Sequence, residues 1–146
     1  MSGEREAVAR AARQLTDWAA ACKLADIPQE VLARAATVLT DDLAAMIGAG
    51  DEPEVARFHA QVIHRARHHE ATVLRGGTAR VARIDAAVAN AVAANWLELD
   101  EGYRRTPCHA GLYILPALLA TAEADDAPTA ALLRAIVLAY EVVTRI

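Results

Sequence analysis

Acids and an imidazole lie close together in segment 97–109, between two apolar, alanine-rich stretches. Glu98, Asp100 and Glu101 fall within four positions, and His109 follows eight residues after the last of them. Neighbouring carboxylates raise one another's pKa, so one can become a usable acid or base near neutral pH. A neutral imidazole can take a proton or donate to a substrate carboxylate. The segment therefore indicates proton transfer on a small substrate, or else an ordinary solvated loop and helix end.

Two arginines and a cysteine share this segment. Arg104 and Arg105 are able to hold carboxylates through paired hydrogen bonds, although adjacent loop arginines are also commonly solvated. Cys108 precedes His109, but no third group is evident that would orient a Cys–His nucleophile. We therefore interpret Cys108 as a small loop residue.

Two features outside the segment bear on chemistry. His64 and His68 have the four-residue spacing of a metal site on a helix, but no carboxylate or cysteine completes the ligand set, which favours a polar helix face. Asp42 lies on the same helical stripe as apolar residues. A carboxylate there needs a partner, so it either bonds a neighbouring backbone or lines a site.

The elements that position these residues are predicted to be helices. Hydrophobic residues make up 55% of the chain and aromatics only 4%, with alanine the commonest residue, which favours close-packed helices over a sheet. Apolar spacing and Pro/Gly positions predict six of them. The first helix is expected over about 5–22, and the second begins after Ile27-Pro28 and ends at Gly48 and Gly50. The third and fourth are expected over about 53–68 and 81–97. The fifth ends by residue 123, and the sixth follows a turn at 125–129. We expect one all-α domain over residues 1–146, a compact bundle of about six helices, with 72–78 as an extended crossing piece and turn.

Pro116 constrains the fifth helix. A proline deep inside a helix costs roughly 3 kcal/mol or more, but it is tolerated in the first turn. This places the start of the helix near residues 111–114 and leaves 100–110 as a loop.

Composition excludes several classes of partner. The net charge is −4 and no Lys/Arg stripe is present, so nucleic acid is not expected as a partner. No apolar run approaches the roughly 18 residues of a membrane span, and the charged N-terminus does not resemble a signal peptide. Two cysteines are too few for a disulfide framework, so we expect a reduced, cytoplasmic protein. The sixth helix is still apolar at Ile146, which predicts a covering partner chain or a second copy.

Several motifs together resemble the MmgE/PrpD family, which includes 2-methylcitrate dehydratase and cis-aconitate decarboxylase. The motifs are, in chain order, Leu39-Thr40-Asp41-Asp42-Leu43, Asn90, Leu97-Glu98-Leu99-Asp100-Glu101-Gly102-Tyr103-Arg104, His109-Ala110-Gly111, Leu115-Pro116-Ala117-Leu118-Leu119-Ala120, Ala122-Glu123 and Ala139-Tyr140-Glu141-Val142-Val143-Thr144-Arg145. The order agrees with the family over nearly the whole chain. The resemblance implies a helical domain and chemistry on small carboxylic acids without a metal or organic cofactor.

Carried over residue by residue, the resemblance assigns catalytic roles to Glu98, Asp100 and His109. It leaves substrate binding to the neighbouring polar residues Arg104, Arg105, Tyr103 and Asn95. Four positions depart from the family pattern. Asn95 replaces a histidine, Glu101 replaces the second aspartate, Tyr103 stands where relatives often carry another polar or imidazole group, and Ala110 replaces the proline after the histidine. The acid–imidazole pair itself remains.

Family members are about three times as long, as chains of several domains are, and carry a lid domain beyond the matched part. The resemblance therefore implies one helical subunit of a split lyase or isomerase, with a second polypeptide supplying the lid half. The alternatives are a non-catalytic assembly or regulatory domain, or a pocket reused for isomerisation or cyclisation in a biosynthetic pathway. A homo-oligomer is compatible with each of these.

Overall fold

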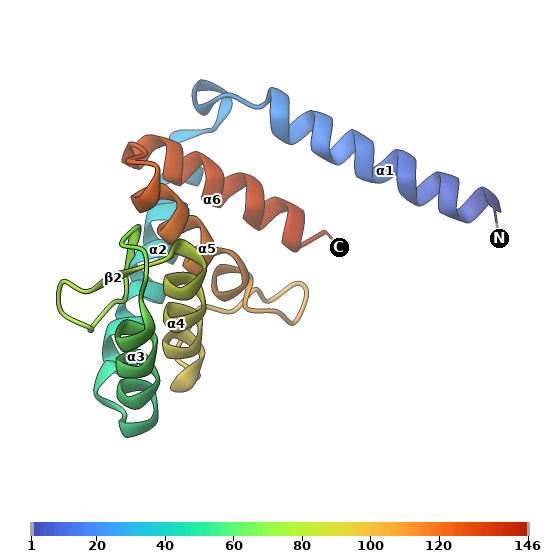
Figure 1. The fold of residues 1–146 in the computed structure, drawn as a ribbon. Helices are drawn as coiled ribbons and strands as arrows, with labels where there is room; N and C mark the ends of the chain where they lie inside the picture. The colour runs from blue at the N-terminus through green and yellow to red at the C-terminus, as the bar shows by residue number, and fades with distance from the viewer. Residues whose placement is uncertain (1, 146) are drawn as a thin grey trace.

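The computed structural model describes residues 2–145 and is mostly helical (Figure 1). The elements in chain order are α1 (Ser2–Ala21), the 3-10 turn Leu24–Asp26, α2 (Gln29–Gly48), the 3-10 turn Ala49–Asp51, α3 (Pro53–Arg65), β1 (Ala71–Thr72), β2 (Arg80–Val81), α4 (Arg83–Trp96), α5 (Ala110–Ala124) and α6 (Thr129–Val143). The predicted all-α fold of six helices is confirmed. Within residues 2–145, no helix combines the length and apolar character needed to cross a bilayer.

The main core lies between α2, α4, α5 and α6. Met46, Leu115 and Ile136 come from three of these helices and are at most 1% exposed. Helix α4 contributes Ala93 and Ala94, both fully buried, and packs most extensively against α5. Small side chains at that contact let the two backbones approach closely, which explains how a chain with few aromatics still closes its core.

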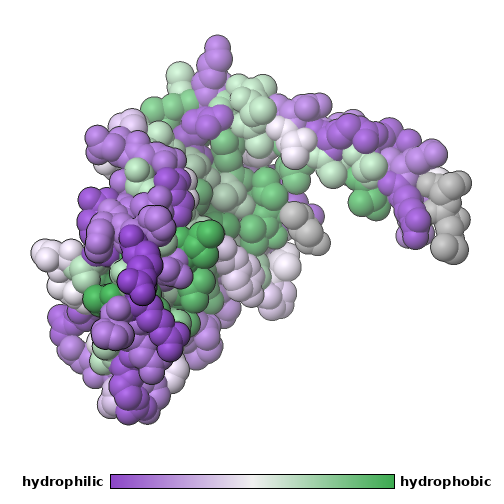
Figure 2. Space-filling view, in the orientation of Figure 1, coloured by the Kyte–Doolittle hydropathy of each residue, from purple (hydrophilic) through white to green (hydrophobic). Residues whose placement is uncertain are grey.

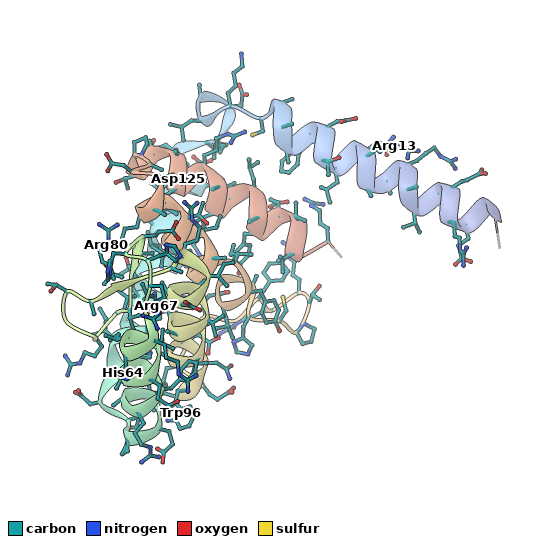
Figure 3. The ribbon with its side chains drawn as sticks, viewed as in Figure 1. Arg13, His64, Arg67, Arg80, Trp96 and Asp125 are labelled. Carbon is teal, nitrogen blue, oxygen red and sulfur yellow. The ribbon has the colours of Figure 1, made fainter. Side chains whose placement is uncertain are left out.

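Helix α1 extends away from the other helices (Figure 1), and Arg13 on it is labelled far from His64 and Trp96 in Figure 3. Its C-terminal end is held by Arg134, whose guanidinium donates to the carbonyls of Cys22 (2.7 Å) and Ala19 (3.2 Å). Figure 2 shows hydrophobic surface on the hollow side between this helix and the body. Five helices therefore form the bundle. Two large apolar side chains of α1, Val8 and Trp18, remain exposed.

A small hairpin crosses the bundle between α3 and α4. Strands β1 and β2 are antiparallel, with Ala71 opposite Val81. Asn90 of α4 holds the strand that follows β1, because its side chain accepts from the Leu74 N–H (2.9 Å) and donates to the Thr72 carbonyl (3.0 Å). The predicted crossing piece at 72–78 is thus a strand end and turn fixed by a buried amide.

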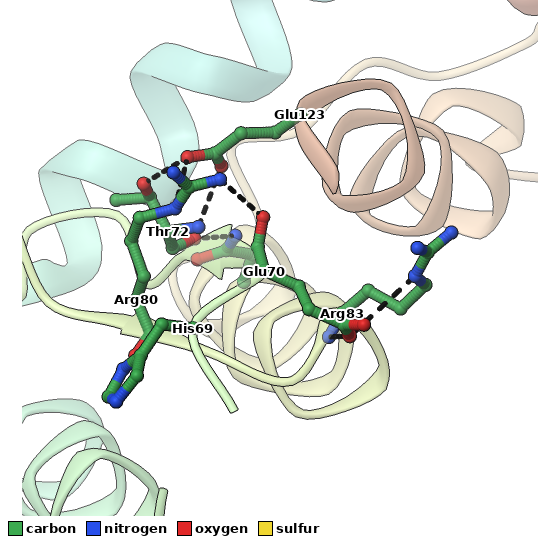
Figure 4. Close-up of polar contacts among 7 residues, drawn as sticks. His69, Glu70, Thr72, Arg80, Arg83 and Glu123 are labelled. Atoms are coloured by element: carbon green, nitrogen blue, oxygen red, sulfur yellow. Dashed lines mark hydrogen bonds and ion pairs between the residues drawn. The ribbon is translucent and has the colours of Figure 1, made fainter. Parts of the chain in front are cut away.

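The carboxylates of Glu70 and Glu123 form hydrogen bonds and ion pairs around the same hairpin (Figure 4). Glu123 accepts from the Thr72 N–H (2.7 Å) and hydroxyl (2.6 Å), and its Oε1 lies 3.3 Å from Arg80 Nε. Glu70 accepts from the Arg83 N–H at the start of α4. That bond, followed by the charge of Arg83, lowers the pKa of Glu70.

Two of the helix boundaries that differ from the sequence prediction change its interpretation. Helix α3 ends at Arg65 rather than at 68, so His68 is not on a helix and the four-residue metal spacing does not apply. Helix α5 begins at Ala110, which puts Pro116 inside the helix rather than in its first turn. The earlier start is supported at Gly111, whose N–H is bonded to a glutamate from the preceding loop.

Candidate functional site

The chain between α4 and α5 folds back on itself so that its two ends meet. Glu98 turns the chain out of α4 in the left-handed region, with φ of 52°. Farther along, the Tyr103 N–H donates to the Cys108 carbonyl (2.8 Å) and closes a short bridge. Since this bridge joins the two arms of the loop, it returns His109 to the side of Asp100.

Asp100 and His109 form an acid–imidazole pair. His109 Nδ1 lies 2.9 Å from Asp100 Oδ2; the Asp100 side chain is 0% exposed and the His109 side chain 41%. Neither Nδ1 nor the carboxylate has a hydrogen bond of regular angle within residues 2–145, so the contact is an ion-pair distance rather than an aligned hydrogen bond. A buried acid facing one ring nitrogen leaves the opposite nitrogen, Nε2, on the outer edge of the imidazole.

Glu101 lies beside this pair and ties the loop to two helices. Its Oε1 accepts from the Gly111 N–H (2.5 Å) in the first turn of α5, and its Oε2 accepts from the Tyr140 hydroxyl of α6 (2.8 Å). Burial and then this hydrogen bond raise the pKa of Tyr140, so the phenol remains a donor. The carboxylate satisfies one orphan N–H of α5 and places negative charge at the positive end of the helix.

Asp42 of α2 is the third acid of the cluster. It is 0% exposed, and neither of its side-chain oxygens has a hydrogen-bond partner within residues 2–145. Burial raises its pKa to about 7, and the negative charges of Glu101, Asp100 and Asp41 act in the same direction. The Glu101 backbone N–H offsets part of this rise without reaching hydrogen-bond geometry.

Gly111 makes room for Asp42. A Cβ at Gly111 would overlap Asp42 Oδ2 and would lie 3.0 Å from Glu101 Cγ. The start of α5 can therefore approach the buried carboxylate only because this residue has no side chain.

The other residues predicted for the site are not gathered around the pair. Glu98 and Asn95 are exposed at the end of α4, and among residues 2–145 no side-chain hydrogen bond or ion pair joins them to Asp100 or His109. Arg104 and Arg105 are exposed on the loop. Tyr103 is half-buried and packs edge-to-face on Tyr140, with ring centroids 5.9 Å apart.

An open cavity of ≈ 470 Å³ lies against the exposed side of His109. Its walls include Tyr103, Arg104, Cys108 and Tyr113. Of the predicted binding residues, this cavity brings Tyr103 and Arg104 to the imidazole, while Arg105 lies on another cavity.

Sequence reasoning missed Gly111 and Tyr140 and left Asp42 open. The signals for Asp42 were its place on a buried stripe and the family resemblance of segment 39–43. Its surroundings include Asp100, Glu101 and Gly111, which lie 58 to 69 positions farther along the chain, and spacing cannot reveal such contacts. His59 of α3 is buried, and its Nε2 contacts the Ala89 carbonyl (3.1 Å), so it links α3 to α4. Within residues 2–145, no group of three or more His, Cys, Asp or Glu is arranged to hold a metal ion.

The family profile described as the MmgE/PrpD N-terminal domain matches residues 13–146. The chain belongs to the MmgE/PrpD family. The match covers almost all of the MmgE/PrpD chain described above, including α2, the loop with Asp100 and His109, and α6. Comparisons with curated proteins and with solved structures found no match.

Proposed function

We propose that this MmgE/PrpD chain is a helical subunit of a lyase or isomerase that acts on a small carboxylate-bearing substrate by cofactor-free acid–base chemistry. The observation that carries the proposal is the pair formed by buried Asp100 and partly exposed His109, 2.9 Å apart, at the wall of an open cavity. Asp100 faces Nδ1 and stabilises the positive charge of the ring after protonation, which leaves Nε2 as the proton-transferring atom.

The surroundings suit an anion whose neighbouring carbon loses a proton. His109 is the N-cap residue of α5, and Arg104, whose guanidinium can pair with a carboxylate, lies on the same cavity. In the proposed step, the Nε2 lone pair takes the proton from the carbon next to a substrate carboxylate. Return of that proton to the same or another carbon gives isomerisation, whereas loss of a leaving group from the adjacent carbon gives elimination.

Exchange of substrate hydrogen for deuterium tests this without a known product. Small di- and tricarboxylic acids are incubated with the protein in D₂O, and proton NMR follows the C–H groups next to each carboxylate. We expect exchange with at least one acid, and a fall of about 100-fold or more for His109→Gln, as expected for a lost general base. Asp100→Asn should also slow exchange, while His64→Gln, at an exposed histidine outside the site, should not. Equal rates for His109→Gln and wild type would contradict the proposal.

We also propose that a second polypeptide covers the open side of the cavity and supplies the lid half of the enzyme. The support is that His109 is partly exposed to solvent. A reaction that is sensitive to water requires this side chain to be covered. Co-expression with candidate neighbouring genes, followed by co-purification, tests this. An active monomer with full turnover would contradict it.

A non-catalytic assembly domain is the second candidate. The projecting α1, with Val8 65% and Trp18 43% exposed, favours it because a helix with an uncovered apolar face is suited to contacts with another chain. In this case His109→Gln would change no turnover, whereas Val8→Ser with Trp18→Ser would abolish assembly in light scattering.

A further inference from the structure

A second cavity, of ≈ 490 Å³, lies between α2 and α6, and it shares Gly102, Tyr103 and Arg104 of the loop with the cavity at His109. Neither Asp100 nor His109 lines it, so it is separate from the acid–imidazole pair. Its volume is within the range of small-molecule sites in proteins.

The floor of this cavity is apolar. Val31, Ala35 and Val38 come from α2, while Ile136 and Val137 come from α6. Ala35, Val38 and Ile136 belong to the main core and are held rigidly by it. A ligand here would therefore meet a fixed hydrocarbon surface rather than a mobile loop.

The rim of the cavity is positively charged. It carries Arg34, Arg104 and Arg105, and none of these is in an ion pair within residues 2–145. Two acids, Glu30 and Glu141, also line it, but Glu141 is already bound to Arg145, with its Oε2 2.9 Å from Nε. The charges left for a ligand are thus three guanidinium groups against one carboxylate.

One wall is fixed by the network described above. Tyr140 lines the cavity, and its hydroxyl is held by Glu101 while its ring is held by Tyr103. The Tyr140 side chain therefore has a fixed position in the wall, and its hydroxyl hydrogen is not available to bond a ligand. Recognition of a head group has to come from the arginines.

We propose that this cavity binds an aliphatic anion, an alkyl chain on the floor of α2 and α6 with a carboxylate head at Arg104 and Arg105. Guanidinium groups bind carboxylates and phosphates in paired hydrogen bonds, so both head groups share the required chemistry. The cavity shares Tyr103 and Arg104 with the cavity at His109, but its apolar floor and Arg105 do not line that one, so the proposal does not depend on the reaction proposed at His109.

Calorimetry with straight-chain carboxylates of four, six, eight and ten carbons tests the proposal. We expect the dissociation constant to fall about fourfold for each added CH₂ until the floor is covered. Octyl phosphate in place of octanoate distinguishes the two head groups, and neutral octanol measures the tail alone. Octanoate should bind at least tenfold more tightly than octanol.

Matched variants assign the effect to the cavity. Arg104→Ala with Arg105→Ala should weaken octanoate at least tenfold and leave octanol unchanged. Arg65→Ala with Arg67→Ala removes the same charge from exposed positions outside the cavity and should leave octanoate unchanged. Val31→Asp, at a floor position 38% exposed, should abolish the dependence on chain length. Far-ultraviolet circular dichroism checks that each variant is folded.

Three results would overturn the proposal. The first is an affinity that does not depend on chain length, and the second is an equal affinity of the two double-arginine variants for octanoate. The third is a dimer in light scattering that Val31→Asp dissociates, because the cavity would then be occupied by a second copy of the chain. His109→Gln separates this proposal from the catalytic one. It should leave octanoate binding intact even where deuterium exchange is lost.

Discussion

At the scale of single residues, the unusual group is Asp42, a fully buried carboxyl with no hydrogen-bond partner among the described residues. Ionising it would place a negative charge beside Glu101 and Asp100 in the protein interior. Its pKa of about 7 means that the folded protein holds a proton which the unfolded chain releases near pH 4. Asp42 therefore couples the stability of the fold to pH.

The sign of this coupling gives the first prediction. Between about pH 4 and 7 the native state binds more protons at Asp42 than the unfolded state, so its contribution to stability falls as pH rises. The loss amounts to at most about 4 kcal/mol, because each pKa unit is worth about 1.4 kcal/mol. Urea unfolding from pH 4 to pH 8 should show a shallower pH dependence for Asp42→Asn than for wild type. Parallel curves would contradict a raised pKa.

Gly111 gives the second prediction at this scale. Gly111→Ala should lower the free energy of unfolding by about 2 kcal/mol or more, because the new methyl overlaps the Asp42 carboxyl in a packed interior. Gly102→Ala is the matched control, since a Cβ there meets nothing within 4 Å. In an Asp42→Ala background the cost of Gly111→Ala should shrink, because the two positions are in contact. An equal cost in both backgrounds would show that the overlap is not the cause.

At the scale of elements, local pattern predicted helices well and their ends less well. Apolar spacing, Pro28, Pro53 and the glycines after α2 are local signals, so the six helices could be predicted. The early start of α5 depends on Glu101 bonding to Gly111, and the position of α1 depends on the bonds of Arg134 to its C-terminal end. Such causes are tertiary, so periodicity does not contain them.

The same division holds for the candidate site. Asp100 and His109 were predicted to lie close because they share one loop, and they lie 2.9 Å apart. Glu98 has the right residue type but a backbone turn directs it to the surface. Asp42 of α2 and Tyr140 of α6 contact this loop from helices that are distant in the sequence. The local sequence around the loop does not predict these contacts.

The hairpin between α3 and α4 carries the third prediction. Asn90→Ala should lower the free energy of unfolding by about 2–4 kcal/mol, because it leaves the Leu74 N–H and the Thr72 carbonyl without partners in the interior. Asn95→Ala, at an exposed asparagine of the same helix, should change it by less than about 0.5 kcal/mol. Chemical denaturation measures both. Equal effects would mean that the amide does not hold the strand.

At the scale of the whole molecule, α1 and the five-helix body should differ in stability. Isolated helices are marginal in water, and most helical stability in proteins comes from packing of one face. Helix α1 is held mainly through its last residues by Arg134, whereas α5 is packed between α4 and α6.

Hydrogen exchange gives the fourth prediction. Backbone amides in the first half of α1 should exchange close to the rate of an unstructured peptide, while those of α5 should be protected by the full unfolding free energy. Mass spectrometry of peptides after timed deuterium labelling measures both. Strong protection of residues 3–12 at low micromolar concentration would contradict an uncovered α1 and would indicate a partner or a second copy.

The projection of α1 also has a consequence for the overall dimensions of the protein in solution. A helix of 20 residues is about 30 Å long, comparable to the diameter of a small domain. A compact protein of 146 residues would have a radius of gyration of about 15 Å. With α1 extended, the measured radius should exceed this value, and the pair-distance distribution from X-ray scattering should have a long tail. Removing α1 should shorten that tail and leave the main peak, which comes from the five-helix body, in place.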